Sequence, residues 1–418
     1  MTQRFASVMF SLPLLLNPMC FVLTSFAEEA AHPATESAPA AIESSHTTTE
    51  EAIADGTKSR EENDADGLVN LLSDLRGAVR AFPDSVEDRL DLADALYRVG
   101  DLDQAIDEAG AAVALKSDSA AAHLQLGLLY MAKQDWKHAL LELKEATRLN
   151  PELIQGHYHL GAVYYGLGNV PAAIQSYQTA LDLQPDFPDA RYHLGLLLKL
   201  THRDKEAATL LEAAAEGGVA RAQLFMANAY RTGQGVEKDL ARAIFWWLRA
   251  AENGIVQARE SLARLRRQAL SPDQPDRRRK EALEAFTQYR DGLWADYPDA
   301  VKNSPDESLG AVLLKNSQAT NGVSVLFSEA YTLSETATDE LARRYAGGLD
   351  SRLKQFDRRI LACLEATAAD GFAPAKKALA RIYGKGLGVP ADLAKAKALL
   401  KGLPKQEAKA ILDEITVH

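Results

Sequence analysis

Cysteine, aromatic residues and excess positive charge are all scarce in this chain. Only Cys20 and Cys363 occur among the 418 residues, and aromatic residues make up 7% of them. Cys20 lies in a predicted leader, so the mature chain would keep one cysteine and form no intramolecular disulfide. The formal net charge is −11, and both a general nucleic-acid binder and a protein attached to an anionic membrane surface need a basic face. Both functions are therefore disfavoured, and the fold must be held by packing.

Motifs for catalysis and cofactor binding are missing as well. The sequence has no glycine-rich phosphate loop after a strand, no His-Glu-x-x-His, no Gly-x-Ser-x-Gly and no paired cysteines. Gly233-Gln234-Gly235 and Gly386-Leu387-Gly388 suggest a nucleotide loop, but each is expected between two helices within a repeat. We therefore predict no enzyme activity and no cofactor.

Recurring histidines and one cysteine are candidates for a metal site and a nucleophile. A stacked metal site from recurring histidines lacks a carboxylate or thiol at ligand spacing, so packing between helices is favoured and no metal is predicted. Cys363 lies in the apolar run 360–364, where a thiol behaves as a small buried hydrophobe. The histidines that recur near the start of successive predicted helices are His123, His157, His159 and His193.

The N-terminus resembles a secretory leader. Arg4 precedes an apolar stretch over 5–26, and Ser25-Phe26-Ala27 offers a small-residue site before Glu28. We expect cleavage after Ala27 and a periplasmic or otherwise exported location. An uncleaved membrane anchor is the alternative, although Pro13, Asn17 and Pro18 would interrupt a spanning helix. Lipid attachment at Cys20 is disfavoured, because the three residues before it are not small.

A fixed repeat begins after an Ala-, Glu-, Ser- and Thr-rich stretch. Gly127, Gly161 and Gly195 are spaced 34 residues apart. The same period relates Leu126, Leu160 and Leu194, then Ala139, Ala173 and Ala207, then Ala146, Ala180 and Ala214, then Pro151 and Pro185. This pattern resembles the tetratricopeptide repeat (TPR), in which the glycine brings two helices close and the proline ends the second helix. A weaker repeat precedes these over 86–118.

The residues that recur in each repeat change after Gly217-Gly218. The new pattern resembles the Sel-like (Sel-one type) repeat, whose loop glycines would adopt positive φ and whose aspartate would cap the next helix. Two copies occur at a constant offset of 153, through Ala222, Tyr230, Gly233, Gly235, Val236, Asp239 and Ala243 in the first and Ala375, Tyr383, Gly386, Gly388, Val389, Asp392 and Ala396 in the second. The second copy has Leu399 in place of the aromatic Trp246.

The predicted fold is all-α, a right-handed superhelical solenoid of antiparallel helical hairpins. Its predicted segments are a signal peptide (1–27), a disordered acidic linker (28–66), TPRs with an N-terminal capping helix (67–217), a Sel-like repeat (218–268), a helical insertion of unknown fold (269–358) and a second Sel-like repeat with a C-terminal cap (359–418). Within the insertion, Ser304 is a predicted N-cap, and the stretch 323–327 fits either a short strand or part of a helix.

The TPR resemblance implies a concave groove lined by the first helix of each repeat. Aromatic and apolar groups there would suit an extended or helical peptide. Of the two adjacent tryptophans, Trp246 is expected in the hairpin core and Trp247 is a possible contact. The residues predicted to line the groove are Leu90, Tyr97, Leu124, Leu128, Met131, Tyr158, Tyr165, Tyr192 and Leu196.

The predicted function is therefore an exported scaffold or adaptor that binds a protein or peptide partner, with a role in envelope or secretion-complex assembly by analogy. No nucleic-acid partner or small-molecule substrate is indicated. One alternative is an enzyme with its site in the insertion, where Asp291, Asp296, Glu307 and Glu329 lack a diagnostic spacing. The other is a structural, self-associating protein that pairs through Trp247 or the insertion.

Overall fold

The protein is described by a computed structural model that covers residues 67–297, 307–316, 319–347 and 356–416. The described residues form helices joined by short turns, and no strand occurs among them. The chain divides into two compact units, Met1–Leu210 and Leu211–His418, each considered by itself. The predicted signal peptide, acidic linker and Ser304 N-cap lie outside the described residues. The expectation of an all-α hairpin fold is confirmed.

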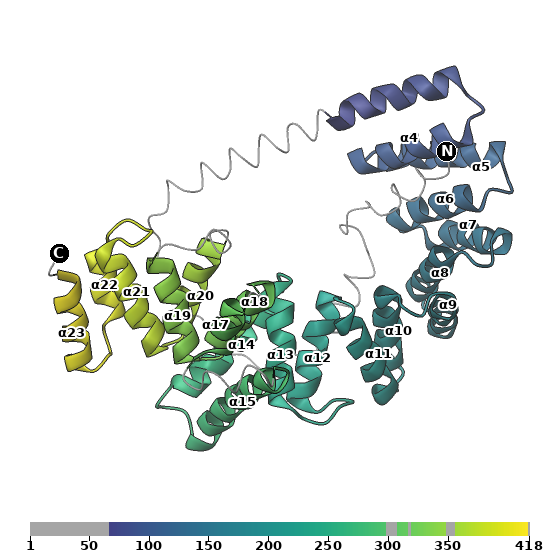
Figure 1. Cartoon of the computed structure of the whole chain (residues 1–418). Coiled ribbons are helices and arrows are strands. Elements are labelled where there is room, and N and C mark those ends of the chain that lie inside the picture. The colour runs from purple at the N-terminus through teal and green to yellow at the C-terminus, as the bar shows by residue number, and fades with distance from the viewer. Residues whose placement is uncertain (1–66, 298–306, 317–318, 348–355, 417–418) are drawn as a thin grey trace. The chain divides into compact units, whose positions relative to one another are not determined.

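Unit 1 consists of antiparallel hairpins that follow one another along the chain (Figure 1). From α4 to α9, each first helix packs on the second helix of its own repeat, and each second helix packs on the first helix of the next repeat, ending with α9 on α10. The elements are a helix over 67–81, α4 (Val86–Val99), α5 (Leu102–Leu115), α6 (Ala120–Ala132), α7 (Trp136–Leu149), α8 (Ile154–Gly166), α9 (Val170–Leu183) and α10 (Pro188–Leu200); α11 (Asp204–Glu216) spans the boundary between the units.

Polar N-caps start the second helices at the repeat period. Asp101, Asp135 and Asn169 are spaced 34 apart, and each side chain accepts a hydrogen bond from the backbone N–H three residues later. Such a cap satisfies one of the free N–H groups at a helix start and stabilises the helix by about 1 kcal/mol. The hairpin turn is thus encoded separately in every repeat.

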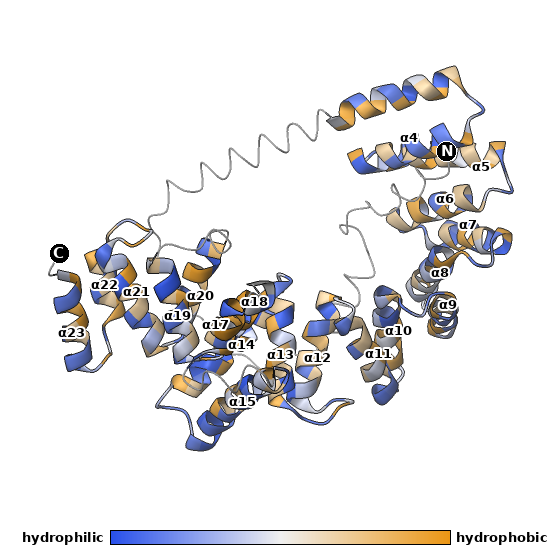
Figure 2. Ribbon diagram, viewed as in Figure 1, coloured by the Kyte–Doolittle hydropathy of each residue, from blue (hydrophilic) through white to orange (hydrophobic). Residues whose placement is uncertain are grey.

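The repeat glycines permit close helix contact, as the sequence predicts. A Cβ on Gly127 would lie 2.7 Å from Cγ of Leu143, and one on Gly161 would lie 2.8 Å from the Tyr177 ring. Leu143 and Tyr177 are fully buried in the second helix of the same repeat. Most helices carry hydrophobic and hydrophilic residues on one ribbon (Figure 2), which fits amphipathic helices that bury one face.

Unit 2 continues the helical pattern through the insertion. Residues 323–327 lie within a helix, so the alternative of a short strand is wrong, and Ser308 caps the first described helix after residue 306. The elements are α12 (Ala220–Thr232), α13 (Leu240–Glu252), α14 (Val256–Leu270), α15 (Asp276–Ala295), α17 (Leu309–Lys315), α18 (Ala319–Tyr331), α19 (Glu335–Ala346), α20 (Asp357–Ala369), α21 (Ala373–Lys385), α22 (Leu393–Leu399) and α23 (Lys405–Thr416).

The 153-residue offset found in the sequence also relates the helix boundaries. Helices α11 and α20 begin and end at positions that differ by 153, as do α12 and α21, and α22 starts 153 residues after α13. Gly233 and Gly386 end the equivalent helices with φ of 79° and 67°, a left-handed conformation that favours glycine. Asp239 and Asp392 then cap the next helices. The predicted roles of these glycines and aspartates are confirmed.

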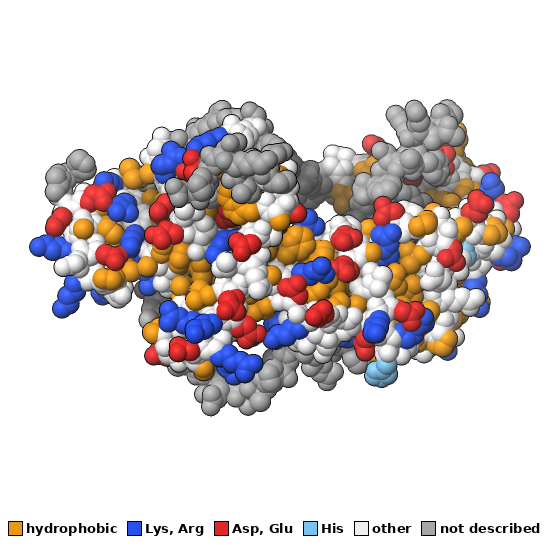
Figure 3. All heavy atoms as spheres, turned by 60° about the horizontal axis from the view of Figure 1, so that its bottom comes forward, with side chains coloured by type: hydrophobic (Ala, Val, Ile, Leu, Met, Phe, Trp, Pro, Cys, Tyr) orange, Lys and Arg blue, Asp and Glu red, His pale blue; other side chains and the backbone are white. Residues whose placement is uncertain are grey.

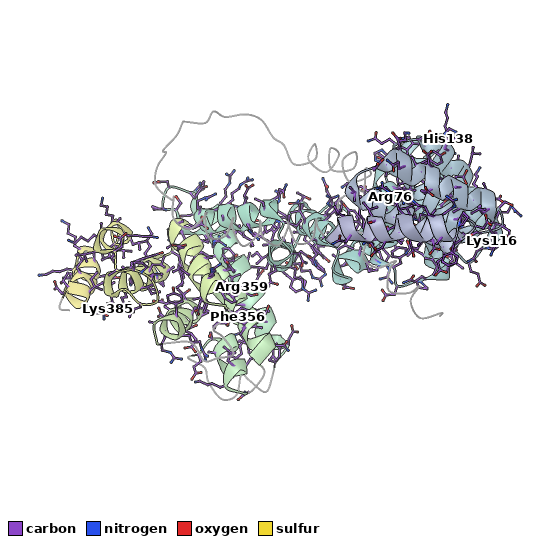
Figure 4. All side chains as sticks on the ribbon, turned by 90° about the horizontal axis from the view of Figure 1, so that it is seen from above. Arg76, Lys116, His138, Phe356, Arg359 and Lys385 are labelled. Carbon is purple, nitrogen blue, oxygen red and sulfur yellow. The ribbon has the colours of Figure 1, made fainter. Side chains whose placement is uncertain are left out.

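Two ion pairs join the helices before the insertion to α20 after it. Nε of Arg266, on α14, donates to Oδ2 of Asp370 at 2.7 Å, and both side chains are buried. Arg359, on α20, pairs with Glu252 at 2.7 Å on the surface, and its guanidinium lies 4.3 Å from the ring centroid of Phe327. Figure 4 labels Arg359 near the start of α20. Helices on the two sides of the insertion in sequence are therefore in direct contact within unit 2.

Candidate functional site

The first helices of unit 1 form one face of the hairpin stack. Helix α4 contacts α6, and α6 contacts α8, so these successive first helices lie side by side. We call the surface formed by α4, α6, α8 and α10 the inner face of unit 1.

The predicted groove residues fall into two classes of exposure. Leu124 and Met131 are 2% and 7% exposed, so they belong to the core and offer little surface. Their positions on α6 lie between two neighbouring repeats, which cover them. The other seven are partly exposed, namely Leu90, Tyr97, Leu128, Tyr158, Tyr165, Tyr192 and Leu196. Their role as a binding surface stays a prediction.

Aromatic rings cluster where α8, α9 and α10 meet. The Tyr158 ring lies 5.6 Å from the Tyr177 ring and 4.9 Å from the Phe187 ring, measured between centroids. Tyr177 is fully buried, and its burial raises the pKa of its phenol well above the usual value. The Tyr192 ring contacts His193 edge-on at 5.2 Å. Tyr158 therefore takes part in packing, and Tyr192 contacts the neighbouring His193.

Ionisable groups on the inner face are displaced toward their neutral forms. Burial raises the pKa of Asp94 and Asp189, and it lowers the pKa of His159 to about 4. Asp189 is exposed, whereas Asp94 and His159 are partly exposed, so the inner face remains accessible to water.

Two of the recurring histidines act as hydrogen-bonding links rather than as ligands. Nε2 of His123 lies 3.1 Å from the Ser117 carbonyl oxygen, and Nε2 of His157 lies 2.9 Å from the Pro151 carbonyl oxygen, six residues back in each case. Nδ1 of His123 also contacts Oε2 of Glu142 at 2.6 Å. These bonds tie the turn between repeats to the following first helix. Within the described ranges, no three His, Cys, Asp or Glu residues are placed to hold a metal ion.

A tyrosine network recurs in both Sel-like copies. The Tyr230 hydroxyl donates to Oε1 of Glu212 at 2.6 Å, and the Tyr383 hydroxyl donates to Oε1 of Glu365 at 2.5 Å. A cation completes each network: Arg242 donates to the Tyr230 hydroxyl at 2.9 Å. In the second copy Lys395 bonds Glu365 at 3.2 Å and lies 3.9 Å from the Tyr383 ring centroid. All three positions differ by 153 between the copies.

The prediction that Trp247 offers a contact is wrong. Trp246 and Trp247 are 3% and 2% exposed, so both are core residues. Adjacent helical positions point about 100° apart, but α13 packs against α12, α14 and α15, which together cover both directions. Self-association through Trp247 therefore lacks an accessible side chain.

The four acidic residues named in the insertion have separate surroundings. Asp291 and Asp296 are exposed, and Glu307 pairs with Lys315 at 2.6 Å. Glu329 is 2% exposed and accepts hydrogen bonds from the backbone N–H groups of Leu309 and Gly310, both at 2.9 Å. Burial raises its pKa to about 7. Glu329 thus holds the start of α17.

Cys363 is an inert core residue, as its surroundings in the sequence indicate. It is fully buried, and burial raises the pKa of its thiol to about 12. A reactive cysteine needs an accessible thiolate, which this environment suppresses. In the part of the chain that the structure describes, no helix combines the length and the apolar character needed to span a membrane.

Comparisons with known proteins support the repeat assignment. The TPR repeat family matches residues 127–168 and 167–201, and the Sel1 repeat family matches residues 220–255 and 373–401, so both predicted resemblances are confirmed. No curated protein matches the chain. Both repeat types are generally non-catalytic interaction modules, and the chain is accordingly a scaffold for protein or peptide partners.

Solved structures of TPR proteins resemble the chain over part of its length. MamA is 27% identical, and the match covers 40% of this chain and 96% of MamA with a TM-score of 0.35. PilF of Pseudomonas aeruginosa is 20% identical, with 51% and 95% covered and a TM-score of 0.41. YrrB, described as a TPR protein with an unusual peptide-binding site, is 23% identical, with 44% and 94% covered and a TM-score of 0.36.

Proposed function

We propose that the protein is an exported adaptor whose inner face of unit 1 binds an extended or helical segment of a protein partner. The observation that carries the proposal is the series of partly exposed aromatic and aliphatic side chains on successive first helices: Tyr97 on α4, Leu128 on α6, Tyr165 on α8, and Tyr192 and Leu196 on α10. The repeats support the general role, and this series supports the choice of the inner face as the binding surface.

The chemistry of these side chains suits a peptide. Tyrosine buries a large ring at a small entropic cost and keeps a hydroxyl that bonds a peptide backbone. Exposed hydrophobic side chains also occur among charged ones on the face of the molecule seen in Figure 3. Single exposed apolar residues are therefore no proof of a site, and the repeated series is the stronger signal.

The binding surface is tested with Tyr192→Ala/Leu196→Ala, one helical turn apart on α10. The chain and the variant are used as bait in cross-linking pull-downs from extracts of the source cell. The control is Leu141→Ala/Leu183→Ala, which removes exposed leucines from second helices. We expect the inner-face variant to lose a specific partner by about tenfold or more, while the control retains it and both keep their helical circular dichroism. An unchanged partner list in the inner-face variant would place binding elsewhere.

Export and assembly are tested separately. The proposal of export rests on the apolar stretch 5–26 followed by the small residues at 25–27. A C-terminally tagged chain should be recovered outside the cytoplasm with Glu28 as its first residue, as measured by mass spectrometry of the N-terminal peptide. Recovery of an intact N-terminus in the cytoplasmic fraction would contradict export. A role in envelope or secretion-complex assembly further requires that the captured partner belong to such a complex.

A further inference from the structure

Negative charge is concentrated in the first TPR of unit 1. Residues 86–118 contain nine acidic and three basic side chains, a net charge of −6. Residues 120–152 contain four of each sign, and residues 154–186 contain two acidic side chains and no basic one. Among the first helices, α4 carries four acidic and two basic side chains, whereas α6 and α8 carry no Asp, Glu, Lys or Arg.

Helix α4 places part of this charge beside the apolar series. Glu87, Asp91 and Asp94 follow one another at helical spacing, and Leu90 and Tyr97 lie next to them on the same helix. Asp91 is exposed, and desolvation together with the nearby Glu87 raises its pKa. Asp94 pairs with Arg98 at 2.7 Å, and Glu87 lies in the first turn of α4, where the helix dipole favours a carboxylate.

Other acidic groups of this repeat have partners within the protein. Glu108 on α5 pairs with Arg89 at 2.6 Å, and Asp103 pairs with Lys133 at 2.6 Å. Over the described ranges, no salt bridge reaches Glu87 or Asp91. Both side chains are exposed, so their carboxylates are accessible to a cation of a binding partner.

We infer that the bound segment presents lysine or arginine side chains to α4 and apolar or aromatic side chains to α8 and α10. This inference rests on the proposed function and adds the composition and direction of the partner segment. Adjacent packed helices lie about 9 Å apart, so the inner face from α4 to α10 spans roughly 27 Å. An extended segment of about eight residues covers that length. Charge at one end would fix the direction in which the segment lies.

Synthetic peptides of about twelve residues test the inference directly with the full chain. One begins with four basic residues and continues with alternating leucine, tyrosine and serine, and the second has glutamate in place of the basic residues. Binding is measured by fluorescence anisotropy at about 50 mM and about 300 mM salt. We expect the basic peptide to bind at least about tenfold tighter at low salt, with most of this difference lost at high salt. Equal affinities, or no binding of the basic peptide below about 1 mM, would overturn the inference.

A charge-matched pair of variants locates the effect. Glu87→Gln/Asp91→Asn removes two charges from α4, and Asp107→Asn/Asp118→Asn removes two exposed charges elsewhere in the same repeat. The first variant should weaken the basic peptide by about five- to tenfold and leave the acidic peptide unchanged, and the second should weaken it by less than about twofold. Equal losses in both variants would reduce the effect to net charge and refute the assignment to α4.

Failure of this inference is distinguishable from failure of the proposed function. If Tyr192→Ala/Leu196→Ala weakens both peptides while their affinities for the unaltered chain are equal, the inner face binds peptides but does not select basic ones. If that variant weakens neither peptide although both bind, the inner face is not the binding surface and both proposals fall.

Discussion

Removal of the Asp370 carboxylate is expected to destabilise unit 2 more than any surface change. The side chains of Arg266 and Asp370 are 4% and 5% exposed, and two bonds of 2.7 Å join them. Asp370→Ala would leave the Arg266 guanidinium buried with one long bond, of 3.4 Å, to the Tyr331 carbonyl oxygen. An uncompensated buried charge of this kind costs about 3–5 kcal/mol.

The expected loss is a large part of the total. Folded domains are stable by about 5–15 kcal/mol, so Asp370→Ala should bring unit 2 close to its unfolding threshold. Arg267 also bonds Asp370, at 3.2 Å, but its side chain is 60% exposed and stays hydrated when the carboxylate is removed. The loss therefore comes mainly from Arg266.

Urea unfolding followed by tryptophan fluorescence measures the effect, because Trp246, Trp247 and Trp294 all report on unit 2. Asp370→Ala should lower the unfolding free energy by about 3–5 kcal/mol. Adding Arg266→Met should restore at least about half of the lost unfolding free energy, because the second change removes the buried guanidinium that Asp370→Ala leaves unpaired.

The control is a surface ion pair in the same unit. Glu252→Gln breaks the pair with Arg359, whose side chains are 40% and 41% exposed, and should cost less than about 1 kcal/mol. A loss below about 1 kcal/mol for Asp370→Ala, or a double variant as unstable as the sum of the single changes, would refute the argument that burial makes this pair critical.

Three further changes test the packing and the titration of buried groups. Gly310→Ala should cost about 3 kcal/mol or more in thermal unfolding, because its Cβ would meet the α18 backbone at 2.4–2.5 Å, whereas Gly292→Ala has open space and should be neutral or stabilising. His123→Ala should lower the unfolding free energy by about 1–3 kcal/mol in the same assay, because it removes the hydrogen-bond partner of Glu142 and of the Ser117 carbonyl oxygen. The folded-state pKa of Glu329 is raised to about 7, so its contribution to stability is complete below about pH 4.5 and is lost as pH rises through about 7. The midpoint of thermal unfolding should therefore be higher at pH 5 than at pH 8. Glu329→Gln should remove this difference.

The repeat architecture can be predicted from the sequence because its characteristic residues recur at a fixed interval. Glycines at 127 and 161 predicted close helix contact, and the contacts with Leu143 and Tyr177 confirm it. The N-caps Asp101, Asp135 and Asn169 carry the same 34-residue period. This spacing is visible in the sequence, and it predicts where each of these second helices starts.

Burial and contacts that depend on several helices are harder to predict from the sequence. The geometry of one helix predicts Trp247 on an open side of α13, whereas α13 also packs against α15, which belongs to the insertion and carries no repeat signal. The bond between Arg266 and Asp370 joins positions 104 residues apart, and no sequence period connects them. Among the groove residues, Leu124 differs from Leu128 in exposure because of contacts between repeats that the alignment of repeats does not record.

The tyrosine network explains why the 153-residue offset extends beyond the matched repeats. The Sel1 repeat matches begin at residues 220 and 373, yet each network takes its carboxylate, Glu212 or Glu365, from the helix before. A buried tyrosine hydroxyl needs such an acceptor, so a Sel-like hairpin without its preceding helix would leave a polar group unsatisfied. The structural unit is therefore three helices. This accounts for α20, which supplies Glu365 to the second copy as α11 supplies Glu212 to the first.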